Sequence, residues 1–289
     1  MNFKFYFLFS GIYLLTAFHL IAQDNLGKVK YQVESSFDIT KDSAQKILQN
    51  LDFEKKERTD FVFDAFDGEN FLLFPGKRKI RFRMKEDEEK KVLQINTNIN
   101  FINRKCPKGQ SILIREKENG EINLSANQYE YLKTGNQLLN LPDLNPSQTL
   151  KSLKELDQYL KKIQLPLKSE LEKTFPKKWV YLPINLSKKK KYKHKVNFGY
   201  GDITVSISGG EDYIGEKFLQ EKWELEFQVN PKDWIDSKCK GKYCGFEKSI
   251  CLFMESQNLS AKDFNPPKIS PYDVLKKEIP NLSKLLPSP

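Results

Sequence analysis

Charged side chains recur at every second position in several segments of the chain. This spacing places them on one face of a β-strand, and whole segments carry a single sign of charge. The residues are basic at Lys79, Arg81, Arg83, Lys85, Lys191, Lys193 and Lys195, and acidic at Glu34, Glu224 and Glu226. Basic side chains from several strands could bind a polyanion such as polyphosphate, and clustered carboxylates could hold a divalent cation that bridges its oxygens. The pattern therefore indicates phosphate binding or phosphoryl transfer, which depends on positioning and electrostatics.

A solvated sheet is the alternative explanation of this alternation. An antiparallel sheet with one face in water also alternates polar and apolar residues. Like charges along one strand repel, however, so a solvated face more often mixes the two signs. The sorting of charge by strand therefore favours polar faces that line the inside of a closed sheet.

Strands dominate the expected secondary structure. Alternation predicts strands at residues 28–37, 79–85, 93–99, 191–198, 202–208 and 223–229, with shorter candidates at 61–63, 112–117 and 121–124. Helices are expected in three places: from a cap at Thr40 or Asp42 to Leu51, between Pro146 and Pro166, and from Ser249 to Gln257. We predict an α+β, mainly β fold, an antiparallel closed β-barrel (tunnel) with a polar interior and a few flanking helices.

The N-terminus has the features of a secretory signal. Lys4 precedes an apolar run, and Ala22 is a small residue suited to cleavage. An uncleaved anchor is the alternative, although the run is short and interrupted for a bilayer of about 30 Å. We predict a signal peptide at 1–22, one domain at 23–268 and a loosely ordered tail at 269–289, with a secreted or periplasmic location and no membrane span after cleavage.

The cysteines agree with export. Cys106, Cys239, Cys244 and Cys251 make an even number in a chain with an expected signal, which favours disulfides. Their spacing lacks the closely paired cysteines typical of a zinc knuckle, so a zinc site is the weaker alternative. Of the three possible connectivities, the sequence selects none.

Composition excludes some classes of function. The formal net charge is +10, 39% of residues are hydrophobic, and 21 Phe and 12 Tyr provide apolar surface for a core, which excludes a disordered chain. The two histidines are His19 and His194, and His19 lies inside the expected signal. A His-rich zinc site is therefore excluded, and a Ser-His-Asp hydrolase would depend on His194 alone.

The order of several short motifs resembles the CYTH family, the triphosphate tunnel superfamily of thiamine triphosphatases, inorganic triphosphatases and class IV adenylyl cyclases. The helix after residue 40 is followed by FVFDAFDG (61–68) and IRFR (80–83), and then by KKKKYKHKV (188–196), GDITVSIS (201–208), KWELEFQV (222–229) and PPKISPYDVL (266–275). The resemblance covers nearly all of the chain after the expected signal. It rests on the order of the motifs rather than on any one of them.

The resemblance implies roles for individual residues. Glu34 matches the second glutamate of the family's Glu-x-Glu-x-Lys strand, and Glu224 and Glu226 match its distal acidic pair. These three would be ligands of Mg or Mn, with Glu34 and Glu226 as the catalytic carboxylates. Phosphate contacts are implied for Arg81, Arg83, Lys191, Lys193 and Lys195, and Arg115 occupies the place of a further arginine.

The sequence departs from the family pattern at three places. Gln32 replaces the first glutamate of the signature strand, Ser36 replaces its lysine, and Gln94 or Asn96 stands where a lysine is usual. Each charge-assisted contact contributes about 1.5–3 kcal/mol, so these changes weaken both metal and phosphate binding.

Two functions of different classes follow. The first is a secreted CYTH-like protein that binds a triphosphate or polyphosphate-type anion with a divalent metal, and acts as a metal-dependent phosphohydrolase if it is active. The second is a non-catalytic secreted protein whose basic surface, including the run Lys188 to Lys191, binds an anionic glycan, a membrane or another partner. Nucleic acid is not expected as a partner, because no nucleic-acid-binding motif accompanies the charge. The oligomeric state stays open.

Overall fold

The structure is a computed structural model, and it describes residues 30–72, 79–85, 91–124, 155, 157–158, 179–229 and 239–277. The expected signal at 1–22 and most of the helix expected between Pro146 and Pro166 lie outside these residues. No helix in the described ranges has the length and apolarity needed to cross a membrane.

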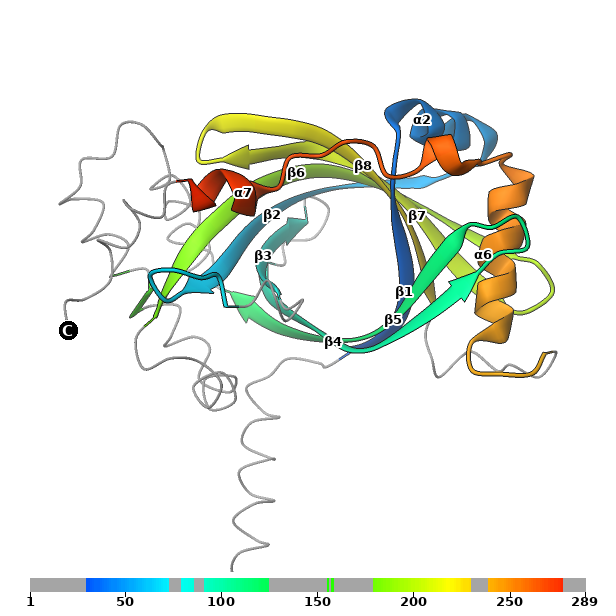
Figure 1. The fold of residues 1–289 in the computed structure, drawn as a ribbon, viewed down its shortest axis with the longest axis horizontal. Helices are drawn as coiled ribbons and strands as arrows, with labels where there is room; N and C mark the ends of the chain where they lie inside the picture. The colour runs from blue at the N-terminus through cyan, green and yellow to red at the C-terminus, as the bar shows by residue number, and fades with distance from the viewer. Residues whose placement is uncertain are drawn as a thin grey trace, which may run out of the picture.

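Long antiparallel strands form most of the described chain (Figure 1). They are β1 (Lys30–Ile39), β2 (Glu54–Phe66), β3 (Lys79–Lys85), β4 (Lys91–Lys105), β5 (Ser111–Leu124), β6 (Val180–Asn197), β7 (Asp202–Ile214) and β8 (Lys217–Val229). Neighbours pair in the order β1-β5-β4-β3-β2-β6-β7-β8, and β1 pairs with β8 as well as with β5. The prediction of a mainly β, antiparallel sheet is confirmed.

Two predicted boundaries were wrong. The candidates at 112–117 and 121–124 are one strand, β5, which runs through Gly120 without a break. The candidate at 61–63 is only the centre of β2, whose first half carries charged residues on both faces and therefore shows no alternation in the sequence.

Three α-helices flank the sheet within the described ranges. Helix α2 (Lys41–Asn50) begins as expected at Thr40, whose Oγ1 accepts a hydrogen bond from the Ser43 backbone N–H at 3.2 Å. Helix α6 (Cys244–Ser256) contains most of the third predicted helix and begins earlier than expected. Helix α7 (Pro271–Lys276) lies inside the segment expected to be loosely ordered, yet its Tyr272 and Leu275 are buried.

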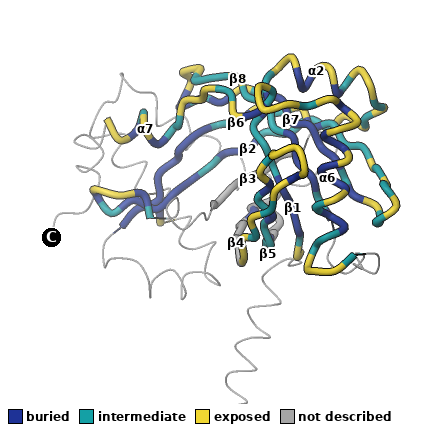
Figure 2. Tube along the Cα trace, turned by 45° about the vertical axis from the view of Figure 1, so that its right-hand side comes forward, coloured by how far each residue is buried: buried dark blue, intermediate teal, exposed yellow. Residues whose placement is uncertain are grey.

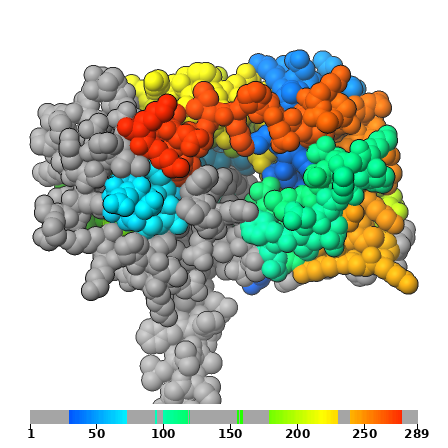
Figure 3. Space-filling view, viewed as in Figure 1, coloured from blue at the N-terminus to red at the C-terminus, as the bar shows by residue number. Residues whose placement is uncertain are grey.

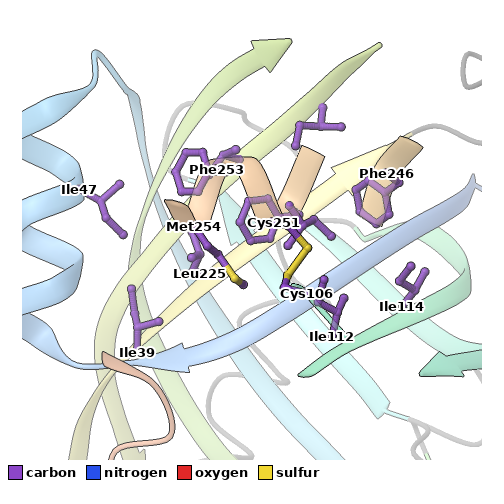
Figure 4. Close-up of a cluster of buried hydrophobic side chains, with 14 of the residues drawn as sticks. Ile39, Ile47, Cys106, Ile112, Ile114, Leu225, Phe246, Cys251, Phe253 and Met254 are labelled. Carbon is purple, nitrogen blue, oxygen red and sulfur yellow. A yellow bond between two sulfur atoms is a disulfide. The ribbon is translucent and has the colours of Figure 1, made fainter. Parts of the chain in front are cut away.

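The hydrophobic core lies on one face of the sheet, beneath α2 and α6 (Figure 4). Leu225 and Phe227 of β8 are fully buried there against residues such as Ile47 of α2 and Phe253 of α6. A disulfide joins Cys106, just after β4, to Cys251 of α6, and a second joins Cys239 to Cys244. The disulfide prediction is confirmed, and the zinc alternative fails because all four thiols are oxidised.

The segment after α6 crosses one edge of the sheet (Figure 3). A short 3-10 turn, η1 (Ala261–Asp263), begins this crossing. The backbone N–H of Asn265 then donates to the carbonyl of Asp38 at 2.9 Å, and the hydroxyl of Tyr272 donates to Asp64 Oδ2 at 3.0 Å. This segment therefore connects the end of β1 to the end of β2.

The opposite face of the sheet is polar, and we call it the polar face. On β7, Ile203, Val205 and Ile207 belong to the core, so the residues between them, Thr204, Ser206 and Ser208, lie on the polar face. The same parity places Glu34 of β1 and Glu224 and Glu226 of β8 on it. Figure 2 shows that these strands are mostly buried or intermediate, so the polar face is shielded from bulk water over much of its area.

Candidate functional site

The polar face of β6, β7 and β8 carries lysines, small residues and glutamates side by side. Ser208 pairs with Lys191 on one side and with Glu224 on the other, and the next row consists of Lys193, Ser206 and Glu226. Residues directly opposite in an antiparallel pair share a face. Because serine is short, Lys191 Nζ reaches across β7 to Glu226 Oε1 at 3.1 Å. Both side chains of this ion pair are buried.

A second group of charges lies on β1 and β5. Glu34 is buried and forms ion pairs with Lys117 and with Arg115, whose Nε lies 3.6 Å from Glu34 Oε1. Arg115 also donates to the hydroxyl of Ser36, and Asn119 donates to Gln32. Gln32 and Ser36 thus both accept hydrogen bonds from β5.

Further basic residues extend this arrangement on β2, β6 and β8. Arg58 pairs in register with Lys189, and the next pair along, Asp60 with Ser187, brings an acid beside them. Burial, followed by the charges of Lys222 and Arg58, lowers the pKa of Lys189 to about 7. Three cations therefore lie close enough to oppose one another's charge.

The acids respond differently to these surroundings. Burial raises the pKa of Glu224, but Lys189, Lys222 and Lys191 outweigh it, and the net pKa lies well below its usual range. Burial likewise opposes Lys191 at Glu226, whose pKa is lowered. At Glu34, burial and the charge of Glu226 prevail over Lys117, and the pKa is raised. Of these three carboxylates, Glu34 is thus the one that is most easily protonated.

The structure brings several predicted site residues together and places others apart. Glu34, Glu224, Glu226 and Lys191 lie on the polar face, and Lys193 is half-buried in the adjacent row. Lys195 lies on the same face but is exposed near the end of β6. Backbone register places Arg83 opposite Asp60, and Arg81 opposite Val62 and Gln94.

Sequence reasoning missed four charged residues of the site. They are Arg58, Lys117, Lys189 and Lys222. The two-residue spacing of a strand could have identified three of them. Lys189 lies two residues before Lys191, Lys117 two residues after Arg115, and Lys222 two residues before Glu224. Nothing in the sequence signals Arg58, because the charges around it do not alternate.

The predicted metal ligands do not form a metal-binding group. Within the described ranges, no three His, Cys, Asp or Glu side chains are arranged to hold a metal ion. Glu34 faces Lys117 and Arg115, while Glu226 faces Lys191, so ammonium and guanidinium groups balance the carboxylates. This donor set does not fit a divalent cation as it stands, and we derive no step through one.

Comparison with known proteins gives similarity at the level of structure only. No family model matches the sequence, and no curated protein matches it significantly. Similar solved structures include a Hippeastrum protein with a dominant triphosphatase activity (12% identity, 85% of this chain and 95% of that chain, TM-score 0.42). A second is the Mimivirus capping-enzyme triphosphatase (12% identity, 84% of this chain and 95% of that chain, TM-score 0.38). A third is the S. pombe RNA triphosphatase Pct1 (11% identity, 92% of this chain and 99% of that chain, TM-score 0.36). Because these scores are low, we base the function on the residues of this chain.

Proposed function

We propose that the protein binds a triphosphate- or polyphosphate-type anion on its polar face. The observation that carries the proposal is the group of Lys189, Lys222 and Arg58, in which mutual repulsion and burial lower the pKa of Lys189 to about 7. Lys222 already pairs with Asp212 at 2.6 Å and Arg58 with Asp60 at 3.5 Å, so a bound polyanion would chiefly favour the charged form of Lys189. Lys191 and Lys117 extend the same surface along the sheet.

We further propose that the sheet closes into a tunnel around this surface. The pairing of β1 with both β5 and β8 supports closure. Closure would bring β3, with Arg81 and Arg83, round to face β8, while β2 separates β3 from the lysines of β6. Substrate contacts for Arg81, Arg83, Lys191, Lys193 and Lys195 are part of this proposal.

Hydrolysis of the bound anion is the second part of the proposal. Glu34 has a raised pKa, so it is the carboxylate best suited to accept a proton from an attacking water near neutral pH. Basic side chains would stabilise the charge on the transferring phosphoryl group. Release of phosphate from tripolyphosphate, lost in Glu34→Gln with binding retained, is the expected result. Binding without release in the wild type would leave the protein a binder only.

The test of binding is calorimetric titration of tripolyphosphate into the chain from Gln23 onward, with and without magnesium. Lys189→Met should weaken binding about tenfold to a hundredfold, since a charge-assisted hydrogen bond is lost. Lys190→Met is the matched control, because Lys190 is the next residue of the same strand but is exposed on the other face. Loss in Lys190→Met with no effect of Lys189→Met would instead support the alternative, a partner bound through the basic outer surface.

The same titration distinguishes a metal site from direct binding. If Glu226 only competes with the anion for Lys191, Glu226→Gln should raise affinity in the absence of magnesium. If Glu226 holds Mg or Mn, as the family resemblance implies, the substitution should lower affinity only when the metal is present. Glu221→Gln is the control, since Glu221 is exposed on β8 and pairs with Lys41.

Export is also proposed, with residues 1–22 as a cleaved signal. Two disulfides in one chain support this, because disulfides persist in oxidising compartments. N-terminal mass spectrometry of the protein from an expressing cell should find a chain that begins near Gln23. A retained Met1 would contradict cleavage.

A further inference from the structure

Two buried hydroxyls on the polar face have no hydrogen-bond partner among the described residues. They belong to Ser206 and Ser208 of β7, which are 0% and 3% exposed. Neither Oγ has a donor or acceptor within reach in the part of the chain that the structure describes. Buried hydroxyls are nearly always paired, and an exception calls for an absent water, ion or ligand.

The surroundings of these hydroxyls identify the missing partner. Each serine lies between a lysine of β6 and a glutamate of β8, in the rows Lys193, Ser206, Glu226 and Lys191, Ser208, Glu224. Lys191 and Glu226 form their ion pair diagonally across β7, over the strand that carries both serines. A hydroxyl beside a lysine donates readily to an anion that the lysine attracts.

Burial without a partner is not sufficient by itself, as two other serines show. Ser35 of β1 and Ser249 of α6 are also fully buried with unpaired hydroxyls. Ser35 pairs with Phe227, and Ser249 adjoins Ile250, so both lie on the core side of the sheet. Ser206 and Ser208 differ in having charged neighbours on both sides.

The spacing of the two serines limits the kind of anion. Residues i and i+2 of a strand are about 7 Å apart on one face. Two hydroxyls at that separation can donate to oxygens of different phosphoryl groups of a linear polyphosphate. The pair therefore suits a chain of phosphoryl groups.

We propose that Ser206 and Ser208 donate hydrogen bonds to separate phosphoryl groups of a bound tripolyphosphate-type anion. The anion replaces Glu226 as the partner of Lys191, which uncovers the hydroxyls. This inference rests on the proposed function and adds to it two neutral hydrogen-bond donors for the anion. It requires no metal.

The experiment measures tripolyphosphate binding to Ser206→Ala, Ser208→Ala and the double variant. For tripolyphosphate, each single substitution should weaken binding about tenfold, and the two losses should multiply in the double variant. Ser206→Thr keeps the hydroxyl and should restore most of the affinity.

Ser35→Ala is the matched control, with thermal melting of the ligand-free proteins as a second measurement. Removal of an unpaired hydroxyl should leave the melting temperature unchanged or higher at all three positions, while only Ser206→Ala and Ser208→Ala weaken binding. Equal losses of affinity in Ser35→Ala, or wild-type affinity in the double variant, would overturn the inference and leave the proposed function intact. Failure of the wild type to bind tripolyphosphate would overturn the proposed function itself.

Discussion

The two faces of β7 differ in how fully their side chains are packed or hydrogen-bonded. On the core face, Ile203, Val205 and Ile207 pack among residues of α2, α6 and the neighbouring strands. On the polar face, Ser206 and Ser208 lie between unlike charges and have no hydrogen-bond partner in the described part of the chain. One face of β7 therefore stabilises the fold, and the other has hydrogen-bonding groups available to a ligand, as expected for a binding surface.

The largest effect should come from the core face of β8. Phe227 is fully buried and makes edge-to-face contacts with Phe37 and Phe253, so Phe227→Ala should cost about 3–5 kcal/mol in the free energy of unfolding. Glu226→Gln changes the adjacent residue on the polar face, leaves Lys191 without this partner, and should cost less, about 1–3 kcal/mol. Urea denaturation of both variants would measure the difference, and similar costs would remove the distinction between the faces.

A disulfide comparison tests the core side further. The bond between Cys106 and Cys251 closes 145 residues of chain, whereas that between Cys239 and Cys244 closes only 5. Replacing the first pair with serine should therefore destabilise the protein by about 2–5 kcal/mol, and replacing the second pair should have a smaller effect. Thermal unfolding of both double variants provides the measurement. A larger loss from the short loop would contradict the expected order.

The ion pair across β7 provides a prediction on the polar face. Lys191→Met leaves Glu226 buried without its nearest cation, and should cost about 1–3 kcal/mol in the free energy of unfolding at pH 7. The loss should shrink in Lys191→Met combined with Glu226→Gln, because no unpaired charge then remains. A double-mutant cycle by urea denaturation tests this, and additive losses would show that the pair is not coupled.

Sequence patterns predicted the faces of the sheet better than the contacts between strands. Alternation placed Glu34, Glu224 and Lys191 on one face, because strand periodicity is a local property. It gave no register, so the diagonal contact of Lys191 with Glu226 and the serines beneath it could not be foreseen. Disulfide connectivity also depends on distant chain packing and was left open.

Local sequence patterns also could not predict which cations lie next to the carboxylates of the site. The carboxylates read as metal ligands were assigned one strand at a time, and the sequence did not show that β5 and β6 would bring Lys117 and Lys191 to them. Gln32 and Ser36 are neutral side chains on β1, and they accept hydrogen bonds from Asn119 and Arg115 of β5.

The smallest expected effect is the pH dependence set by Lys189. Its pKa is about 7 in the folded protein, below the ordinary lysine value, so the folded state releases this proton before the unfolded state does. Its contribution to stability should therefore rise as the pH increases from about 7 to about 10.5, because the unfolded chain binds the proton more tightly.

A bound anion favours the charged form of Lys189, so tripolyphosphate affinity should fall severalfold between pH 6.5 and about 8.5. The gain of negative charge by the ligand itself would produce the opposite trend. Lys189→Arg keeps the charge throughout this range and should remove the decline. Calorimetry at both pH values, in buffers of different ionisation enthalpy, should also detect proton uptake on binding in the wild type and less in Lys189→Arg. Equal uptake in the two proteins would assign the proton to another group.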